Sequence, residues 1–318
     1  MTARLAMTVG DPRGIGPEIV AKALADPRVG GRFDILVVGA RNAGVDVGES
    51  VGDWRADMGA AAAGKLSGLA IERAVQMAMD GEVDGIVTAP IDKAALLAGG
   101  YDYPGHTEML AELTGSRVAM MLASDKLRVV LATTHIALRD VGEALSRDTI
   151  VDAADVTRRG LQEWFGIDEP RLALCALNPH AGDSGRFGDE DAVLLAPAAR
   201  AAGIAGPFPA DTVFVRAMRG EFDAVIAPYH DVGMTAIKVA SFGSAVNVTL
   251  GLPFPRTSPD HGTAIDIAGQ NKADPSSMIE ATLLCGSIAS RARRLGDRQA
   301  SADRPKDSRS SGRPSRAR

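Results

Sequence analysis

Residues 128–136, with the sequence RVVLATTHI, run from a block of apolar residues straight into a histidine. The same arrangement recurs at 171–180, RLALCALNPH, and at 223–231, DAVIAPYHD. Apolar runs of this length that do not alternate with polar residues are typical of strands buried on both faces of a parallel sheet. The three stretches therefore predict three buried strands, each with a histidine just beyond its end.

Similar apolar runs extend this pattern along most of the chain, and stretches with helical spacing separate many of them. The runs are 4–12, 33–41, 84–92 and 244–253, and the helical stretches are 16–26, 61–81, 148–166 and 192–203. Strands that alternate with helices predict an α/β fold with a mainly parallel sheet. The chain has 318 residues, which is enough for one large or two ordinary domains.

Composition excludes several classes of function. The net charge of −5 gives no overall basic field for nucleic acid. No run approaches the roughly 20 apolar residues of a membrane helix, and no signal peptide is recognisable, so we expect a cytoplasmic protein. Cys175 and Cys285 lie in apolar runs and are expected to be buried thiols. The segment 291–318 is rich in Arg, Ser and Pro and is expected to be a disordered basic tail.

His135, His180 and His230 are the histidines that follow the three apolar runs. Because the carboxyl ends of parallel strands open on one edge of a sheet, these strands would deliver three imidazoles to one place. Three neutral imidazoles suit a divalent metal and leave a coordination position open for substrate. The alternative at each position is a loop histidine that caps its own turn. The spacing is too wide for a local zinc motif.

Two stretches have the pattern of a strand or turn that enters a helix. GDPRGIGPE at 10–18 could hold an anion on free amides, or it could only make a tight connection; it is not the Rossmann fingerprint. PGHTEML at 104–110 places His106 and Thr107 at a helix entry. A hydroxyl and an imidazole beside free amides suit phosphate, although an ordinary threonine cap is the alternative.

The segment 229–264 combines many polar groups with glycine and proline. Lys238 and Arg256 are cations in apolar surroundings, which suits binding of a carboxylate or a phosphate. Either residue could also be simply solvated. Polar groups concentrated in a segment of this kind favour a functional loop.

Together these stretches resemble the PdxA family, the 4-hydroxythreonine-4-phosphate dehydrogenases, over about residues 5–280. The motifs that carry the resemblance, in the family's order, are GDPRGIGPE, VTAPIDK, PGHTE, TTH, LNPHAGD, GPFPADTVF, YHD, VNVTLGLPFPRTS and DHGTA. The resemblance implies a fold like that of the isocitrate and isopropylmalate dehydrogenases, with two α/β domains around a cleft and nucleotide binding outside the Rossmann pattern. We expect one domain from 1–125 plus 240–290 and a second from 126–239.

The resemblance further implies NAD- or NADP-dependent oxidation of 4-phosphooxy-L-threonine, with decarboxylation to 3-amino-2-oxopropyl phosphate, in pyridoxal phosphate synthesis. It implies a homodimer with the active site near the interface and one divalent metal (zinc, magnesium or cobalt) per subunit. The residues that match the family's metal ligands are His135, His180 and His230, and those that match its substrate positions are His106, Thr107, Lys238, Asn247 and Arg256.

Within the same motifs we expect cofactor contacts at Gly251, Asp260 and Gly262, and Lys238 or Asp231 as the base. The sequence departs from the family pattern at Val232, where glutamine is usual, and at Arg13, where a small residue is common. Two alternatives therefore stay open. One is a catabolic dehydrogenase of 4-phosphoerythronate or 4-phosphothreonate on the same fold, and the other is a non-catalytic protein that binds a metabolite.

Overall fold

The computed structural model describes residues 2–241 and 244–302, with side chains as far as Arg294. Its strands are β1 Arg4–Thr8, β2 Asp34–Arg41, β3 Glu49–Asp53, β4 Gly85–Thr88, β5 Ala119–Ala123, β6 Arg128–Leu131, β7 Leu172–Cys175, β8 Ala205–Phe208, β9 Ala224–Ala227, β10 Val246–Leu250 and β11 Arg256–Ser258. Its α-helices are α1 Gly16–Ala25, α2 Gly59–Met79, α3 Lys93–Ala98, α4 His106–Thr114, α5 Val141–Ala144, α6 Arg147–Glu163, α7 Ala196–Ala202, α8 Ala210–Met218, α9 His230–Ser241 and α10 Ser276–Ala302.

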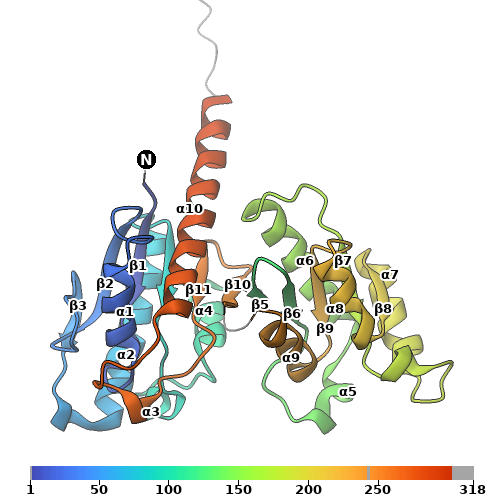
Figure 1. Cartoon of the computed structure of the whole chain (residues 1–318), viewed down its shortest axis with the longest axis horizontal. Coiled ribbons are helices and arrows are strands. Elements are labelled where there is room, and N and C mark those ends of the chain that lie inside the picture. The colour runs from blue at the N-terminus through green and yellow to red at the C-terminus, as the bar shows by residue number, and fades with distance from the viewer. Residues whose placement is uncertain (1, 242–243, 303–318) are drawn as a thin grey trace, which may run out of the picture.

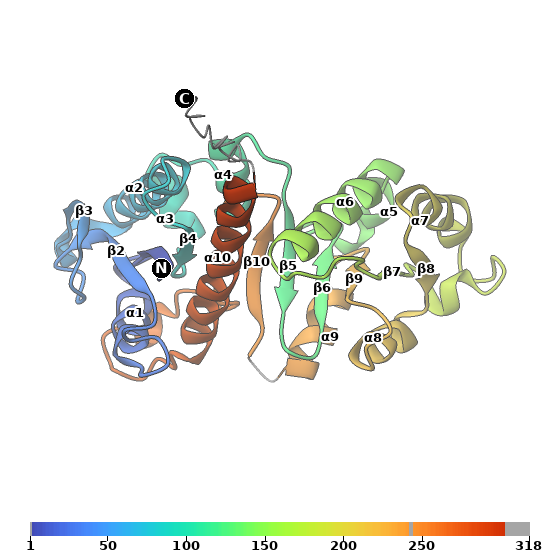
Figure 2. The same cartoon turned by 90° about the horizontal axis from the view of Figure 1, so that it is seen from above.

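The described strands form one eleven-stranded sheet in the order β3-β2-β1-β4-β11-β10-β5-β6-β9-β7-β8. Pairings at both ends of this order are parallel. The central strand β10 is antiparallel to β11 and to β5, and β5 is antiparallel to β6. The α/β fold with a mainly parallel sheet is confirmed. Figure 2 shows β10 and β5 side by side where the two halves of the molecule meet.

Helices cover both faces of the sheet, as expected for strands that are apolar on both sides (Figure 1). In the amino-terminal half, α2 packs Ile71 and Val75 against one face. On the other face Ile19 of α1 and Ile279 of α10 belong to a core that continues through the centre of the sheet into α6 of the other half. Cys175 and Cys285 are both buried free thiols, as predicted.

The predicted domain boundaries fall between β5 and β6 in the strand order, because β1 to β5 with β10 and β11 lie on one side and β6 to β9 on the other. The sheet itself is continuous across this point through the β5–β6 pairing. Two domains with these boundaries therefore stay a prediction. Among the described helices, none combines the length and the apolar character needed to cross a membrane.

The predicted start of the tail at residue 291 is wrong. Helix α10 continues through that position and ends at Ala302. Extending a formed helix costs little, and the Arg, Ala, Leu and Gln residues that follow 291 favour helix. Arg293 also pairs with Asp84 at 3.1 Å, beyond the predicted boundary. The rest of the predicted tail, 303–318, lies outside the described residues.

Close packing between α2 and α3 requires a residue without a side chain at Gly64. A Cβ added there would lie 1.7 Å from the backbone oxygen of Ala95. We expect Gly64→Ala to lower the free energy of unfolding by about 1–3 kcal/mol, although alanine is normally the better helix former. Chemical denaturation followed by circular dichroism measures this.

Gly142 in α5 is the matched control, because a Cβ added there meets nothing within 4 Å. Gly142→Ala should leave the stability unchanged or raise it by up to about 1 kcal/mol. Equal effects of the two substitutions would contradict the packing argument.

Candidate active site

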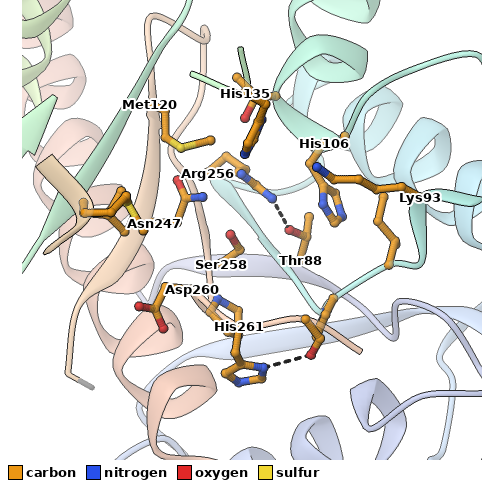
Figure 3. A pocket seen from close by; sticks show the side chains of 18 of the residues that line it. Thr88, Lys93, His106, Met120, His135, Asn247, Arg256, Ser258, Asp260 and His261 are labelled. Carbon is orange, nitrogen blue, oxygen red and sulfur yellow. Dashed lines mark hydrogen bonds between the residues drawn. The ribbon is translucent and has the colours of Figure 1, made fainter. Parts of the chain in front are cut away.

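A cavity of about 400 Å³ lies over the antiparallel centre of the sheet and is lined from both halves of the molecule. Met120 and Leu122 of β5 line it together with Asn247, which pairs with Leu122 across the β5–β10 ladder. These three side chains share one face, since alternate residues of a strand and directly opposed residues of neighbouring strands point the same way. Figure 3 shows Met120 and Asn247 on one side of the cavity, with Arg256 between them and His106.

The remaining walls come from segments far apart in the sequence. They are Thr88, Pro90, Ile91 and Lys93 after β4, Gly105 to Glu108 at the start of α4, His135 after β6, His230, Met234 and Lys238 of α9, and Arg256 with Ser258 to Gly262 in and after β11. Every predicted substrate residue, namely His106, Thr107, Lys238, Asn247 and Arg256, is therefore brought together. Of the expected cofactor residues, Asp260 and Gly262 are among them.

Two of the three predicted metal ligands meet in this cavity. The rings of His135 and His230 have centroids 5.4 Å apart and are tilted by 44°. They come from β6 and β9, which are adjacent and parallel, so their ends open on the same edge as predicted. His230 Nδ1 lies 2.7 Å from Asp231 Oδ1, a contact that fixes the ring and directs Nε2 away from this carboxylate.

His135 is in the protonation state that metal binding needs. Partial burial, the charge of Lys93 and the neighbouring His230 lower the pKa of His135 below 6.5. A neutral imidazole can donate a lone pair to a cation without first releasing a proton. Both rings therefore fit a divalent cation in the type of donor atom that they offer.

The third predicted ligand, His180, does not line the cavity of its own chain. It is exposed, in the short 3-10 segment Pro179–Gly182, and its closest described ring is Phe187 at 6.5 Å between centroids. In the described part of the chain no three His, Cys, Asp or Glu side chains are grouped closely enough to hold a metal. The described chain thus brings two of the three predicted imidazoles to this place.

The segment that carries His180 is held in an unusual backbone conformation. His180 has φ 53° and Ala181 has φ 55°, which is the left-handed region that residues with side chains rarely adopt. The buried carboxylate of Asp191 accepts hydrogen bonds from the amides of Leu177 at 2.8 Å and Asn178 at 2.9 Å. A strained segment tied down in this way is typical of functional loops.

Arg256 is a buried cation in the wall of the cavity, with an exposed fraction of 1%. Its guanidinium donates to Thr249 Oγ1 at 2.9 Å and to Thr88 Oγ1 at 2.6 Å, and Nε has no partner among the described residues. Burial lowers the pKa of Arg256 to about 9, which still leaves the group charged at neutral pH. A buried charge without a counter-ion is costly, so this wall favours an anionic ligand.

Other buried polar atoms in the same cavity also lack partners within the described residues. They are His106 Nε2, Asn247 Oδ1 and His261 Nε2. Buried polar atoms are normally hydrogen-bonded, and each unsatisfied one costs about 1–3 kcal/mol. Their convergence on one cavity points to a small polar ligand that satisfies several of them at once.

Lys238 and Asp231 differ in their relation to the cavity. Lys238 lines it and pairs with Asp260 at 3.5 Å, with half of the lysine side chain exposed. The Asp231 side chain is 87% exposed, and the residue is not among those that line the cavity. Asp231 is therefore positioned to orient His230 rather than to reach a ligand directly.

Gly251, expected at the cofactor, also lies outside the cavity. Its φ of +90° and the backbone oxygen of Arg117, 2.1 Å from where a Cβ would be, account for glycine at this turn. Val232 packs into the apolar cluster beneath α9. The presence of valine instead of the family's usual glutamine at position 232 therefore does not change the residues that line the cavity.

The glycine-rich stretch 10–18 makes a tight connection in which charged groups pair internally. The buried carboxylate of Asp11 accepts two hydrogen bonds from the Arg13 guanidinium, at 3.1 and 2.7 Å. The Ile15 amide donates to Thr263 O at 2.8 Å and so fixes the loop that carries Asp260 to Gly262. This stretch supports the cavity from behind.

Sequence reasoning missed Thr88, Lys93 and Ser258 as lining residues. Lys93 could have been found, because it closely follows the apolar run 84–92 just as the three histidines follow theirs. Thr88 and Ser258 lie inside strands, and nothing in the local pattern distinguishes a strand residue that faces a cavity from one that faces a helix.

Comparison with known proteins shows the family to which the chain belongs. The model of the family described as pyridoxal phosphate biosynthetic protein PdxA matches residues 28–285. The chain belongs to the PdxA family. A 4-hydroxythreonine-4-phosphate dehydrogenase of Geobacter metallireducens is 42% identical over 90% of this chain and 95% of its own length. A D-threonate 4-phosphate dehydrogenase of Pectobacterium atrosepticum is 40% identical over 91% of this chain and 100% of its own.

Solved structures place the fold in the same family. The 4-hydroxythreonine-4-phosphate dehydrogenase of Klebsiella pneumoniae superposes with a TM-score of 0.82 and 39% identity, covering 91% of this chain and 98% of that one. A beta-decarboxylating dehydrogenase of Thermococcus kodakarensis shares the fold alone, with a TM-score of 0.51 and 15% identity over 95% of this chain and 89% of that one. The expected dehydrogenase-like fold of the PdxA family is confirmed.

His106 offers a test of the electrostatics of this site. Burial, and then the charges of Arg256 and Lys93, lower the pKa of His106 well below 6.5. The folded chain keeps this ring neutral at pH values where the unfolded chain protonates it, so stability is lost as the pH falls through 6.5. Between about pH 6.5 and 5.5 the wild type should lose about 1 kcal/mol more than His106→Gln.

Urea unfolding of both proteins at each pH measures this difference. Parallel stability profiles would mean that His106 titrates normally and that the site is wetter than its burial indicates.

Proposed function

We propose that this PdxA-family chain oxidises 4-phosphooxy-L-threonine with NAD or NADP and that the product loses carbon dioxide to give 3-amino-2-oxopropyl phosphate, a reaction of pyridoxal phosphate synthesis. The observation that carries the proposal is the single cavity that joins an uncompensated buried cation, Arg256, to the imidazole pair His135 and His230. Anion binding beside two cation ligands is what an acid with a phosphate and a reacting hydroxyl requires.

Different side chains of the cavity are proposed to bind different groups of the substrate. His106, Thr107 and the first amides of α4 are proposed to hold the phosphate, because no side chain caps the start of this helix. Arg256 neutralises an anionic group of the substrate, and Asn247 offers a buried oxygen to a donor such as the amino group. In this pose the C3 hydroxyl points to His135 and His230.

Proton transfer is assigned to Lys238, which lines the cavity, whereas Asp231 lies outside it. Lys238, in its neutral amine form, takes the hydroxyl proton as the C3 hydrogen leaves as hydride. The bond between C2 and the carboxylate carbon then breaks, carbon dioxide departs, and the electron pair left on C2 takes up a proton, which Lys238 returns, to give the amino ketone. Asp260 holds Lys238 in place through their 3.5 Å contact.

A divalent cation on His135 and His230 would supply Lewis-acid polarisation of the hydroxyl oxygen and of the ketone that follows. Two imidazoles suit zinc or cobalt better than magnesium, which prefers oxygen ligands. A nicotinamide cofactor would accept the hydride, and Asp260 and Gly262 of the cavity wall are the residues proposed to lie beside it. Neither residue distinguishes NAD from NADP.

We further propose a homodimer in which His180 of the partner subunit completes the metal site. His180 is exposed and lies outside its own cavity, while the pair His135 and His230 lacks a third ligand in the described chain. Phe187, 43% exposed, and Val193, 64% exposed, lie near His180 in sequence, and Leu138, 70% exposed, follows His135. Apolar side chains exposed at both places are suited to a subunit interface.

An absorbance assay for reduced nicotinamide tests the reaction. Purified enzyme with 4-phosphooxy-L-threonine should produce NADH or NADPH, and removal of divalent metal with a chelator should lower the rate at least about 100-fold. Restored activity on adding zinc, cobalt or magnesium identifies the metal. Turnover that survives full chelation would rule out the role given to the histidines.

The same assay separates the alternatives. Faster turnover of 4-phosphothreonate or 4-phosphoerythronate would favour a catabolic dehydrogenase, a reading supported by the similarity to the Pectobacterium D-threonate 4-phosphate dehydrogenase. Metal binding without turnover of any of these acids would favour a protein that only binds a metabolite.

Mixed dimers test the shared metal site. His135→Ala and His180→Ala should each be inactive alone, but co-refolding them in equal amounts should restore about a quarter of wild-type activity. Half of the dimers are then mixed, and each mixed dimer has one site in which His135, His230 and the partner subunit's His180 are all intact. If all three ligands came from one chain, no mixed dimer would have an intact site and no activity would return.

A further inference from the structure

We propose that Lys93 is a phosphate-binding residue of the cavity and forms, with His106 and the start of α4, the wall that recognises the phosphorylated end of the substrate. This inference rests on the proposed function for the identity of the substrate. Its anion-binding part can be tested without turnover.

The position of Lys93 is the first argument. It is the first residue of α3, and its Cε lies 3.7 Å from where a Cβ of Gly105 would be, next to the start of α4. Figure 3 places Lys93 beside His106, on the opposite side of Arg256 from Asn247. The charge of Lys93 also contributes, after burial and Arg256, to lowering the pKa of His106.

The absence of a counter-ion is the second argument. In the described part of the chain no carboxylate forms an ion pair with Lys93, whereas Lys22 and Lys238 are paired at 2.8 and 3.5 Å. Asp92, its neighbour, uses its carboxylate to accept from the Ala95 amide at 2.7 Å and so fixes the start of α3. Lys93 is exposed, and although Glu108 Oε2 lies 3.4 Å from the same Gly105 Cβ position, no ion pair joins these two described side chains, so the charge of Lys93 is available to a ligand.

The third argument is that, without Lys93, the wall beside His106 has too little positive charge to balance the negative charge of phosphate. His106 is neutral and gives only a hydrogen bond, and Glu108 in the same wall is an acid that repels phosphate. Phosphate carries close to two negative charges at neutral pH. Arg256 is enclosed and tied to two threonines, so a second cation on the His106 side is needed for tight binding.

Titration of the full-length protein with inorganic phosphate, followed by calorimetry, tests the binding role directly. Lys93→Met should weaken phosphate binding about 10- to 100-fold, the effect of losing one charge-assisted contact, and Lys93→Arg should keep most of it. Lys126→Met is the matched control, since this exposed lysine in the β5–β6 turn lies outside the cavity, and should bind as the wild type does.

Kinetics provide the second measurement once a phosphorylated substrate is turned over. Lys93→Met should raise KM about 10- to 100-fold and leave kcat within about threefold, because the contact is made before and during the reaction alike. A fall in kcat at unchanged KM would overturn the proposal and assign Lys93 to the chemical step. Unchanged phosphate binding in Lys93→Met, or none in the wild type, would overturn it as well.

Failure of the proposed function looks different. In that case no acid of the panel is oxidised, yet phosphate binding still depends on Lys93.

Discussion

The antiparallel pairing of β10 with β5 is the constraint on which the candidate site depends. It joins two parallel half-sheets that run in opposite directions and holds them as one surface. Residues from β4, β11 and α4 on one side, and from α9 and the segment after β6 on the other, can therefore line one cavity. Asn247 and Leu122 lie opposite each other at this joint and form its floor. A change in the angle between the halves would separate the anion-binding wall from the histidines.

Charge gives this cavity its chemical character. Arg256 is buried with two threonine hydroxyls instead of a carboxylate, and Lys93 faces the same space without an ion pair among the described residues. By contrast, the cations Arg13 and Lys22 are paired with Asp11 and Glu18. Buried charges and polar atoms without partners lower the free energy of unfolding. Binding of an anion would satisfy them and raise the free energy of unfolding again. The cations and polar atoms of the cavity are thus already positioned to bind a negatively charged ligand.

The separation of His180 from His135 and His230 follows from how the His180 segment is built. Asp191 and the left-handed backbone at His180 and Ala181 fix this segment on the outside of its own half. Because the backbone of this segment is fixed, His180 is better placed to contact a partner subunit than to turn back toward the cavity of its own chain. Binding of substrate, metal and partner subunit would then be linked, since a ligand that bridges two chains stabilises their association.

Much of this protein was determined by local sequence. The alternation of apolar runs with turns predicts the buried parallel strands and the helices between them. It also predicts His135 and His230 at the ends of neighbouring strands and His106 at the start of a helix. The tertiary structure decided what that alternation does not encode. Contacts between residues far apart in the chain decided the direction of β10 and the exposure of Asp231. They also placed Lys93 and Thr88 at the cavity and His180 away from it. Hydrophobic periodicity reports which face of an element is buried, but not which distant element buries it.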